Sequence, residues 1–183
     1  TRLATGGGTL YDIGIYCVNA ARYLFQDEPV EATAFWARGD DGRFAEIEEM
    51  VSAVLRFPGE RLASFTCSFG AADNAVYELV GSKGTLRVEP SYEYVGGASW
   101  RIQIGERVLQ RSFAPSDQFA AEIDYFSDCI LTHREPEPSG YEGLADIRII
   151  NALYESARAH RPVTLEPVEN PNRPGRSQEI RRP

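Results

Sequence analysis

Residues 6–25 read GGGTLYDIGIYCVNAARYLF, and we expect the rest of the chain to be organised around this stretch. Three glycines give a backbone that can approach another surface closely, and Thr9 is a favourable N-cap for the helix that follows. Asp12, three residues later, completes a capping-box-like pair that suits the positive end of a helix. Apolar residues then recur at helical spacing and predict one buried stripe: Leu10, Ile13, Cys17, Ala20 and Leu24.

Asp12 and Tyr16 are the candidate functional residues of this helix. They are four positions apart and are expected to project from one helical face, with about 5–6 Å between their Cβ atoms. A carboxylate and a phenol beside a glycine-rich segment can address a polyhydroxylated ligand. Spacing alone leaves a second interpretation open, in which Asp12 caps the helix and Tyr16 is a half-buried aromatic with a local hydrogen-bond partner.

The pattern Gly-Gly-Gly-x-Leu-x-Asp-x-Gly-x-Tyr at residues 6–16 resembles the segment that opens the C-terminal domain of one oxidoreductase family. This is the glucose–fructose oxidoreductase, inositol dehydrogenase and rhizopine-catabolism (Gfo/Idh/MocA) family. Residues 46–57 and 141–157 agree with the same resemblance, which covers the chain from about residue 6 to residue 165. Many members have His in place of Tyr16, and the Tyr form is similar to the glucose–fructose oxidoreductase branch.

The resemblance implies a role for each of these residues. Asp12 would hold a substrate hydroxyl, Tyr16 would exchange its proton, and Gly6, Gly7 and Gly8 would form a loop on the substrate side. It also implies NADP or NAD as cofactor, bound mainly by an N-terminal Rossmann domain, and a sugar or polyol as substrate. Homo-oligomers would form through the open face of the sheet.

The sequence contains neither a G-x-G-x-x-G fingerprint after a strand nor a Glu-Lys-Pro segment, which in this family supplies a lysine beside the site. Phenols ionise near pH 10, so a phenol is a poor base at neutral pH unless a nearby cation stabilises the phenolate. Lys83 is the only lysine, and its place in a Gly-Ser-Lys-Gly segment predicts a hairpin turn and not a phosphate loop. We therefore expect this fragment to bind no cofactor and to be inactive by itself.

Composition narrows the class of protein. The chain has 183 residues with 43% hydrophobic and 25% charged residues, as in a globular domain, and its net charge of −8 argues against a nucleic-acid partner. No membrane-length apolar run or signal peptide occurs, so we expect no membrane partner and a cytoplasmic location, although a longer parent could be exported. Three separated cysteines favour free thiols over disulfides or a metal site. His133 and His160 fit helix C-termini, so no metal is expected.

The order of the predicted elements indicates the fold class. We expect helices at about 9–25, 116–131 and 142–159, and strands at 29–38, 49–57, 61–70, 75–81, 84–89, 99–105, 107–113 and 162–165. This order predicts an α+β domain over residues 1–166, with a mostly antiparallel or mixed open sheet and helices packed on one face. Residues 167–183 are rich in Pro and Arg and predict an irregular tail.

Side-chain patterns predict which faces are buried. The second helix should bury Phe119, Ile123, Phe126 and Ile130, and the third Leu144, Ile147, Ile150, Leu153 and Tyr154. Asp146 and Arg148 are expected on an exposed or interdomain face of the third helix. Small neutral residues on one face of the strand at 61–70 indicate contact with another protein surface: Ser64, Thr66 and Ser68.

The most economical interpretation is the substrate-binding and oligomerisation domain of an NAD(P)-dependent oxidoreductase that acts on a sugar or polyol. One alternative is a non-catalytic binding or assembly module that has the same fold. Another is the domain of a nicotinamide-dependent glycoside hydrolase. The Asp12–Tyr16 pair favours an enzyme over the binding module but does not separate the two kinds of enzyme.

Overall fold

The computed structural model describes residue 4, residues 6–166, residue 168 and residues 174–175. Nearly all of the tail expected at 167–183 therefore lies outside the described residues. The chain divides into two compact units, which are described one at a time. The first unit consists of the described residues of Thr1–Ala71 and Glu137–Glu179, and the second of the described residues of Ala72–Pro136.

The first unit contains a four-stranded sheet in the order β3-β2-β1-β8, with every neighbouring pair antiparallel. Its strands are β1 (Glu31–Ala37), β2 (Met50–Phe57), β3 (Arg61–Ser68) and β8 (Val163–Thr164). β2 and β3 form the predicted hairpin, with Phe57 paired to Arg61. Gly59 and Glu60 in the turn have φ values of +72° and +57°, the left-handed conformation that closes tight hairpins.

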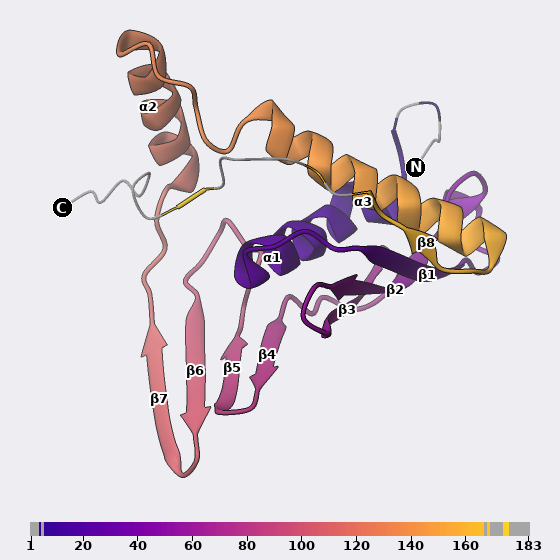
Figure 1. Ribbon diagram of the computed structural model, residues 1–183, viewed down its shortest axis with the longest axis horizontal. Helices are drawn as coiled ribbons and strands as arrows, with labels where there is room; N and C mark the ends of the chain where they lie inside the picture. Colours follow the sequence, from indigo (N-terminus) through magenta and orange to yellow (C-terminus); the bar gives the residue numbers. More distant parts are fainter. Residues whose placement is uncertain (1–3, 5, 167, 169–173, 176–183) are drawn as a thin grey trace. The chain divides into compact units, whose positions relative to one another are not determined.

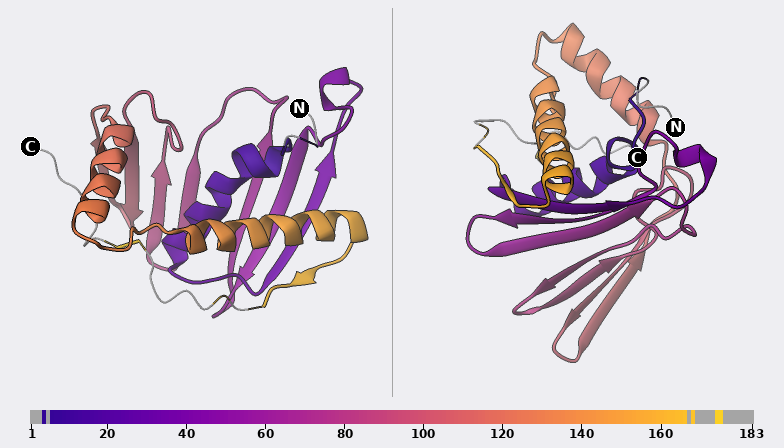
Figure 2. Two further views of the ribbon diagram at one scale, coloured as in Figure 1. Left: turned by 90° about the horizontal axis from the view of Figure 1, so that it is seen from above. Right: turned by 90° about the vertical axis from the view of Figure 1, so that its right-hand side faces the viewer.

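Two helices, α1 (Ile15–Phe25) and α3 (Gly140–Ala159), pack on one face of this sheet (Figure 1). Both further views show α1 and α3 on that same face (Figure 2). Alternate residues of β2 point toward the helices, as the period of a half-buried strand requires. The resulting core is apolar: Leu10, Val18, Ala32, Ala34, Val51, Ala53, Leu55, Phe57, Ile149, Ile150 and Leu153.

The buried stripe of the first helix differs from the prediction. A π-helical turn, Leu10–Gly14, precedes α1, and the fully buried positions are Leu10, Gly14, Val18 and Arg22. The other predicted positions are only partly buried: Ile13, Cys17, Ala20 and Leu24. A π turn has a wider repeat than an α-helix, so it rotates the residues that follow it around the helix axis. A prediction that assumes the ordinary α-helical repeat therefore selects the wrong residues as buried.

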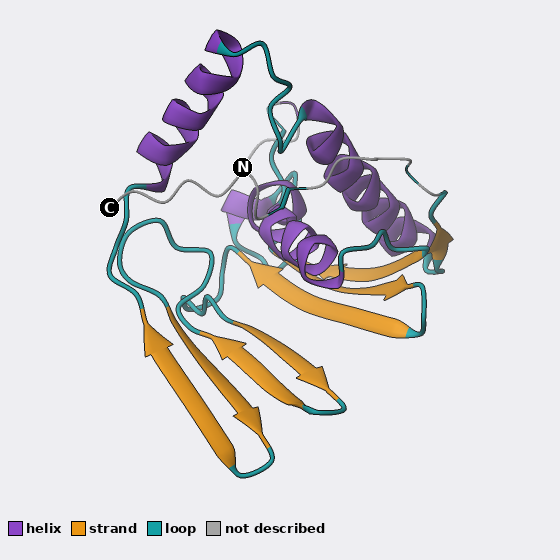
Figure 3. Cartoon of the chain, turned by 60° about the vertical axis from the view of Figure 1, so that its left-hand side comes forward, coloured by secondary structure: helices purple, strands orange, loops and turns teal. Residues whose placement is uncertain are grey.

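The second unit contains another four-stranded antiparallel sheet, in the order β4-β5-β6-β7. Figure 3 shows its strands lying side by side: β4 (Tyr77–Gly81), β5 (Gly84–Val88), β6 (Ser99–Ile104) and β7 (Arg107–Ser112). Ser82 and Lys83 form the tight β4–β5 turn, which confirms the hairpin prediction for this segment. Helix α2 (Gln118–Leu131) follows, and the Asp117 side chain caps it by accepting a bond from the Ala120 N–H at 2.9 Å.

The predicted buried stripe of α2 is wrong. Cys129 is buried, whereas the four residues of the predicted stripe are each more than half exposed: Phe119, Ile123, Phe126 and Ile130. Phe119 packs against the ring of Tyr94, with 5.7 Å between ring centroids. Helical periodicity shows that a helix has an apolar face, but it carries no information about which element covers that face.

Helix α3 also departs from the prediction at two positions. Leu144 is 54% exposed, and Asp146, expected on an exposed or interdomain face, is 4% exposed. Ile150 and Leu153 are fully buried, as predicted. The α+β class and the antiparallel pairing are confirmed, although the strands form two four-stranded sheets where a single sheet was expected.

Candidate functional site

The beginning of the motif helix is held by Glu48, a buried residue that precedes β2. Its Oε1 atom accepts hydrogen bonds from the backbone N–H of Thr9 at 2.7 Å and of Leu10 at 3.4 Å. The Thr9 hydroxyl donates to the Glu48 carbonyl at 2.9 Å. Because the first N–H groups of a helix attract negative charge, this carboxylate serves as the cap. The predicted capping box is therefore wrong: Thr9 has helical torsion angles and its side chain makes no capping bond.

Gly8 lies where the chain turns into this helix. Its φ of +149° is rare for residues with a side chain, and a Cβ there would collide with Tyr154 Oη. The same Cβ would lie 3.1 Å from Glu48 Oε1, to which Tyr154 Oη donates a hydrogen bond at 2.6 Å. The close approach predicted for the glycine segment is thus an approach to residues of this chain. A substrate-side role for Gly6, Gly7 and Gly8 stays a prediction.

A second glycine, Gly14, allows the helix to lie close to β3. A Cβ at Gly14 would come within 2.9 Å of Leu10 Cδ2 and 3.3 Å of Cys67 Sγ. Burial raises the pKa of the Cys67 thiol to about 12, so this cysteine is a packing residue and not a nucleophile. The motif helix is therefore pressed against the sheet on the side of Gly14.

Asp12 and Tyr16 lie on the opposite, exposed side of the helix. Exposed residues recur at positions 12, 16, 19 and 23, and this spacing marks one helical face. The Tyr16 side chain is 53% exposed. A carboxylate accepts hydrogen bonds from hydroxyl groups, and a phenol both donates and accepts them. These groups are chemically able to bind a hydroxyl group, and the substrate-site role of the two residues stays a prediction.

The cation that would assist a phenolate is not supplied by a lysine of this unit. Lys83 lies in the β4–β5 turn of the second unit, as predicted, and the described part of the first unit contains no lysine. The first unit instead concentrates its buried positive charge at Arg22, six residues beyond Tyr16 on α1.

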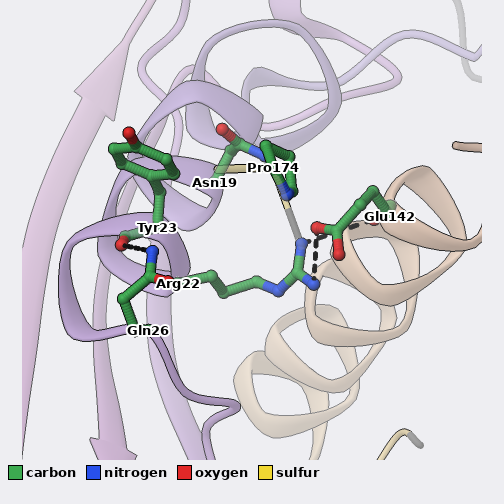
Figure 4. Close-up of a pocket in the computed structure, with 6 residues that line it drawn as sticks. All are labelled: Asn19, Arg22, Tyr23, Gln26, Glu142 and Pro174. Atoms are coloured by element: carbon green, nitrogen blue, oxygen red, sulfur yellow. Dashed lines mark hydrogen bonds and ion pairs between the residues drawn. The ribbon is translucent and has the colours of Figure 1, made fainter. Parts of the chain in front are cut away.

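Arg22 is 1% exposed and is shared by three carboxylates. Its guanidinium lies 2.8 Å from Glu28, 3.0 Å from Glu142 and 2.7 Å from Asp146. Figure 4 shows the Arg22 side chain extending from α1 to Glu142 of α3. Asn19 adds a hydrogen bond to Asp146 at 3.2 Å. These contacts join the C-terminal half of α1 to the N-terminal half of α3.

The protonation of this cluster follows from its burial. Burial opposes the charge on Arg22, but its bonds to Glu28 and Asp146 outweigh that effect and raise its pKa. Burial raises the pKa of Asp146, the Glu28 carboxylate adds to the rise, and the bonds from Arg22 and Asn19 offset it only in part. The cluster is a structural clamp between two helices, and its surplus of carboxylates makes Arg22 its most important member.

Several of these residues were missed by sequence reasoning. Arg22 binds Asp146 across 124 positions, and Glu48 binds Thr9 and Tyr154 across 39 and 106 positions; no local pattern reports such contacts. The i, i+4 spacing of Glu142 and Asp146 was an available signal, since it places two carboxylates on one face of α3. The segment containing Glu48 was recognised only through the family resemblance.

The described part of the chain shows no metal-binding cluster, no disulfide and no membrane-spanning helix. Its His, Cys, Asp and Glu residues form no group of three or more that could hold a metal ion. No disulfide joins Cys17, Cys67 and Cys129. His133 and His160 follow α2 and α3 in the left-handed conformation typical of helix ends. Among the described helices, none has both the length and the apolar character needed to cross a membrane.

Comparison with known proteins gives a family match. Residues 2–165 match the family described as "Oxidoreductase family, C-terminal alpha/beta domain", designated Gfo/Idh/MocA. D-xylose 1-dehydrogenase [NADP(+)] of Haloarcula marismortui is 31% identical over 163 residues, which cover 88% of this chain and 45% of that protein. D-xylose 1-dehydrogenase (NADP(+)) 2 of Haloferax volcanii is 28% identical over 162 residues, covering 87% and 49%.

A solved structure agrees with these matches. The aldose-aldose oxidoreductase from Caulobacter crescentus, crystallised with glycerol, superposes with a TM-score of 0.80 and 40% sequence identity. The superposition covers 87% of this chain and 48% of that one. The chain therefore spans about half the length of the relatives that it matches.

Proposed function

The chain belongs to the Gfo/Idh/MocA oxidoreductases as their C-terminal alpha/beta domain, and from this premise we propose that it is the substrate-side domain of an NAD(P)-dependent oxidoreductase acting on a sugar or polyol. The observation that carries the proposal is the exposed Asp12–Tyr16 face of a helix whose beginning is fixed by Glu48. Two relatives are named as D-xylose dehydrogenases, and a third was crystallised with glycerol, which supports a polyol substrate.

Asp12 and Tyr16 have different tasks in this proposal. The Asp12 carboxylate accepts a hydrogen bond from a substrate hydroxyl and so orients the carbon to be oxidised or reduced. The Tyr16 phenol exchanges the proton of the reacting hydroxyl. In this proposal Gly6, Gly7 and Gly8 form a loop on the substrate side. The nicotinamide supplies the hydride chemistry in the complete enzyme.

The described residues do not themselves fit a dinucleotide. Both sheets are antiparallel, whereas the dinucleotide fold is built from parallel β-α-β units. The helix N-terminus that follows the glycines could attract a phosphate, but the carboxylate of Glu48 already occupies its N–H groups. The cofactor would therefore be held by another part of the complete protein, and this chain would contribute substrate binding and proton transfer.

The open face of the first sheet supports a second part of the proposal, association with another copy of the chain. This face carries small hydroxyl residues and exposed apolar ones: Thr33, Phe35, Ser52, Val54, Leu62, Ser64 and Thr66. Ser52 and Thr66 bond each other at 2.8 Å, which leaves one of the two hydroxyl protons to be donated to a partner. Such a face can pack flat against a symmetry mate.

Calorimetric titration of this chain with NAD and NADP tests whether cofactor binding belongs to another part of the complete protein. We expect no specific heat of binding, because the described sheets are antiparallel and Glu48 occupies the helix N-terminus that follows the glycines. A stoichiometric isotherm in the micromolar range would show that the chain binds cofactor by itself and would overturn the assignment of a substrate-side domain.

A further inference from the structure

The first unit contains a cavity of about 220 Å³ beside the motif helix, away from the exposed Asp12–Tyr16 face. Three aromatic side chains line it: Tyr11 from the π turn, Trp36 from β1 and Tyr154 from α3. The Tyr11 and Tyr154 rings lie 5.4 Å apart with 34° between their planes. A water molecule takes about 30 Å³, so the space suits a small organic molecule better than one or two waters.

One oxygen of the Glu48 carboxylate, which lines the cavity, is bonded by donors of the chain itself. One Glu48 oxygen, Oε1, accepts bonds from the Thr9 N–H, the Leu10 N–H and the Tyr154 hydroxyl. Burial and the Glu48 carboxylate raise the pKa of Tyr154, so its phenol stays protonated and continues to donate. Glu48 Oε1 is therefore committed to donors of the chain itself, while the carboxylate still adds to the negative charge of the lining.

The remaining polar groups offer both donors and acceptors. Tyr11 donates its hydroxyl proton to Asn151 Oδ1 at 2.8 Å, which leaves its phenol oxygen as an acceptor and directs the Asn151 amide N–H groups as donors. Glu46 and Arg158, both exposed, add one negative and one positive charge to the lining. With Glu48 the lining holds two carboxylates and one guanidinium, which disfavours an anion, and its neutral donors and acceptors suit hydroxyl groups.

From this combination we infer that the cavity lined by Trp36, Tyr11 and Asn151 is a binding site for a neutral, hydroxyl-bearing ring such as a monosaccharide. The apolar face of such a ring packs on an aromatic side chain, and its hydroxyl groups use the mixed donors and acceptors around it. The site is separate from the Asp12–Tyr16 face, and the inference does not depend on the proposed function.

This cavity also shares its walls with the contacts that fix the motif helix. Tyr11 belongs to the π turn, and Tyr154 bonds the oxygen of Glu48 that holds the helix N-terminus. A ligand that fills the cavity therefore contacts the residues that position Asp12. This gives the site a direct route by which occupancy can affect the neighbouring helix, in the sense of a coupling between two sites.

Fluorescence of Trp36 provides the test. The chain has two tryptophans, so Trp100→Phe leaves Trp36 as the only emitter. In this background we expect D-glucose or D-xylose to change the emission saturably, with half-saturation at millimolar concentration. Asn151→Leu should weaken the response at least about tenfold, which corresponds to the loss of one or two hydrogen bonds. The matched control Asn74→Leu, an exposed amide of the second unit, should leave it unchanged.

Each other outcome contradicts the inference. No saturable response to either sugar would exclude the site, and a response to tetramethylammonium chloride or sodium acetate in place of the sugars would show a cation or anion site. A sugar response lost in Asp12→Asn but kept in Asn151→Leu would place the sugar on the proposed catalytic face, which would support the proposed function and overturn this inference. Circular dichroism of Asn151→Leu must show an intact fold for the comparison to count.

Discussion

Replacing Arg22 with methionine should lower the free energy of unfolding of the first unit more than the same replacement of an exposed arginine. Methionine keeps much of the aliphatic volume but removes the guanidinium from between Glu28, Glu142 and Asp146. Two buried carboxylates, Asp146 and Glu142 at 4% and 6% exposed, and the partly buried Glu28 then lose the guanidinium that they share. Removing one partner of a buried ion pair typically costs about 3–5 kcal/mol, because the charges left behind are uncompensated.

Arg56 provides the matched control. It too lies near two carboxylates, Glu31 at 3.4 Å and Glu60 at 3.2 Å, but its side chain is 46% exposed. Water and salt screen such pairs, so Arg56→Met should cost no more than about 1 kcal/mol. For a chain of this length about 2–4 °C of melting temperature corresponds to 1 kcal/mol, so we expect Arg22→Met to melt about 6–20 °C lower than the parent.

Urea unfolding followed by Trp36 emission in the Trp100→Phe background reports on the first unit, which contains Arg22. We expect a large loss of unfolding free energy for Arg22→Met and a small one for Arg56→Met. Equal losses for the two variants would refute the reasoning, because they would show that burial of the cluster does not set its contribution to stability.

Three further outcomes follow from the structure. Because the pKa of Asp146 is raised in the folded state, its carboxyl contributes most to stability below its unfolded pKa and loses that contribution as the pH rises through the folded pKa. The loss of unfolding free energy in Asp146→Asn, measured by urea unfolding, should therefore be larger at about pH 3 than at about pH 7. The reverse order would contradict the burial of this group. Gly8→Ala should cost about 1–3 kcal/mol more than Gly6→Ala, since a Cβ collides with Tyr154 at the first position and meets nothing at the second; equal melting temperatures would disprove the close approach. Thr66→Arg should shift the sedimentation pattern toward monomer if copies associate through the open sheet face, and a parent that is already monomeric at tens of micromolar would exclude this interface.

The secondary structure was largely predictable because its signals are local. The Pro58-Gly59 turn, the Ser82-Lys83 turn and the alternation along β2 each depend on neighbouring residues, and each was found where expected. The wrong predictions concern which helix faces are buried against other elements. The apolar stripe of α2 has the right period but is exposed, and the π turn at Leu10–Gly14 displaced the buried line of α1.

The site was predictable only in part. The exposed face that carries Asp12 and Tyr16 follows from helical spacing, and the structure shows it. The support of that face does not, because Glu48 reaches the helix from 39 positions away and Arg22 reaches Asp146 across 124. Thr9 was an acceptable N-cap by residue type, yet a carboxylate supplied by the tertiary fold took its place.

The most direct test of the central claim is the steady-state rate of the complete enzyme carrying Tyr16→Phe, measured with a polyol substrate and its nicotinamide cofactor. The change removes one exposed hydroxyl and leaves the packing of α1 intact, so the melting temperature should be unaffected. We expect kcat to fall by about 10²–10⁴-fold with cofactor affinity unchanged, because a general acid–base group is lost. Asp12→Asn in the same assay should also raise KM for the polyol. A Tyr16→Phe enzyme that keeps half of the parent kcat would contradict the account and remove Tyr16 from the reaction.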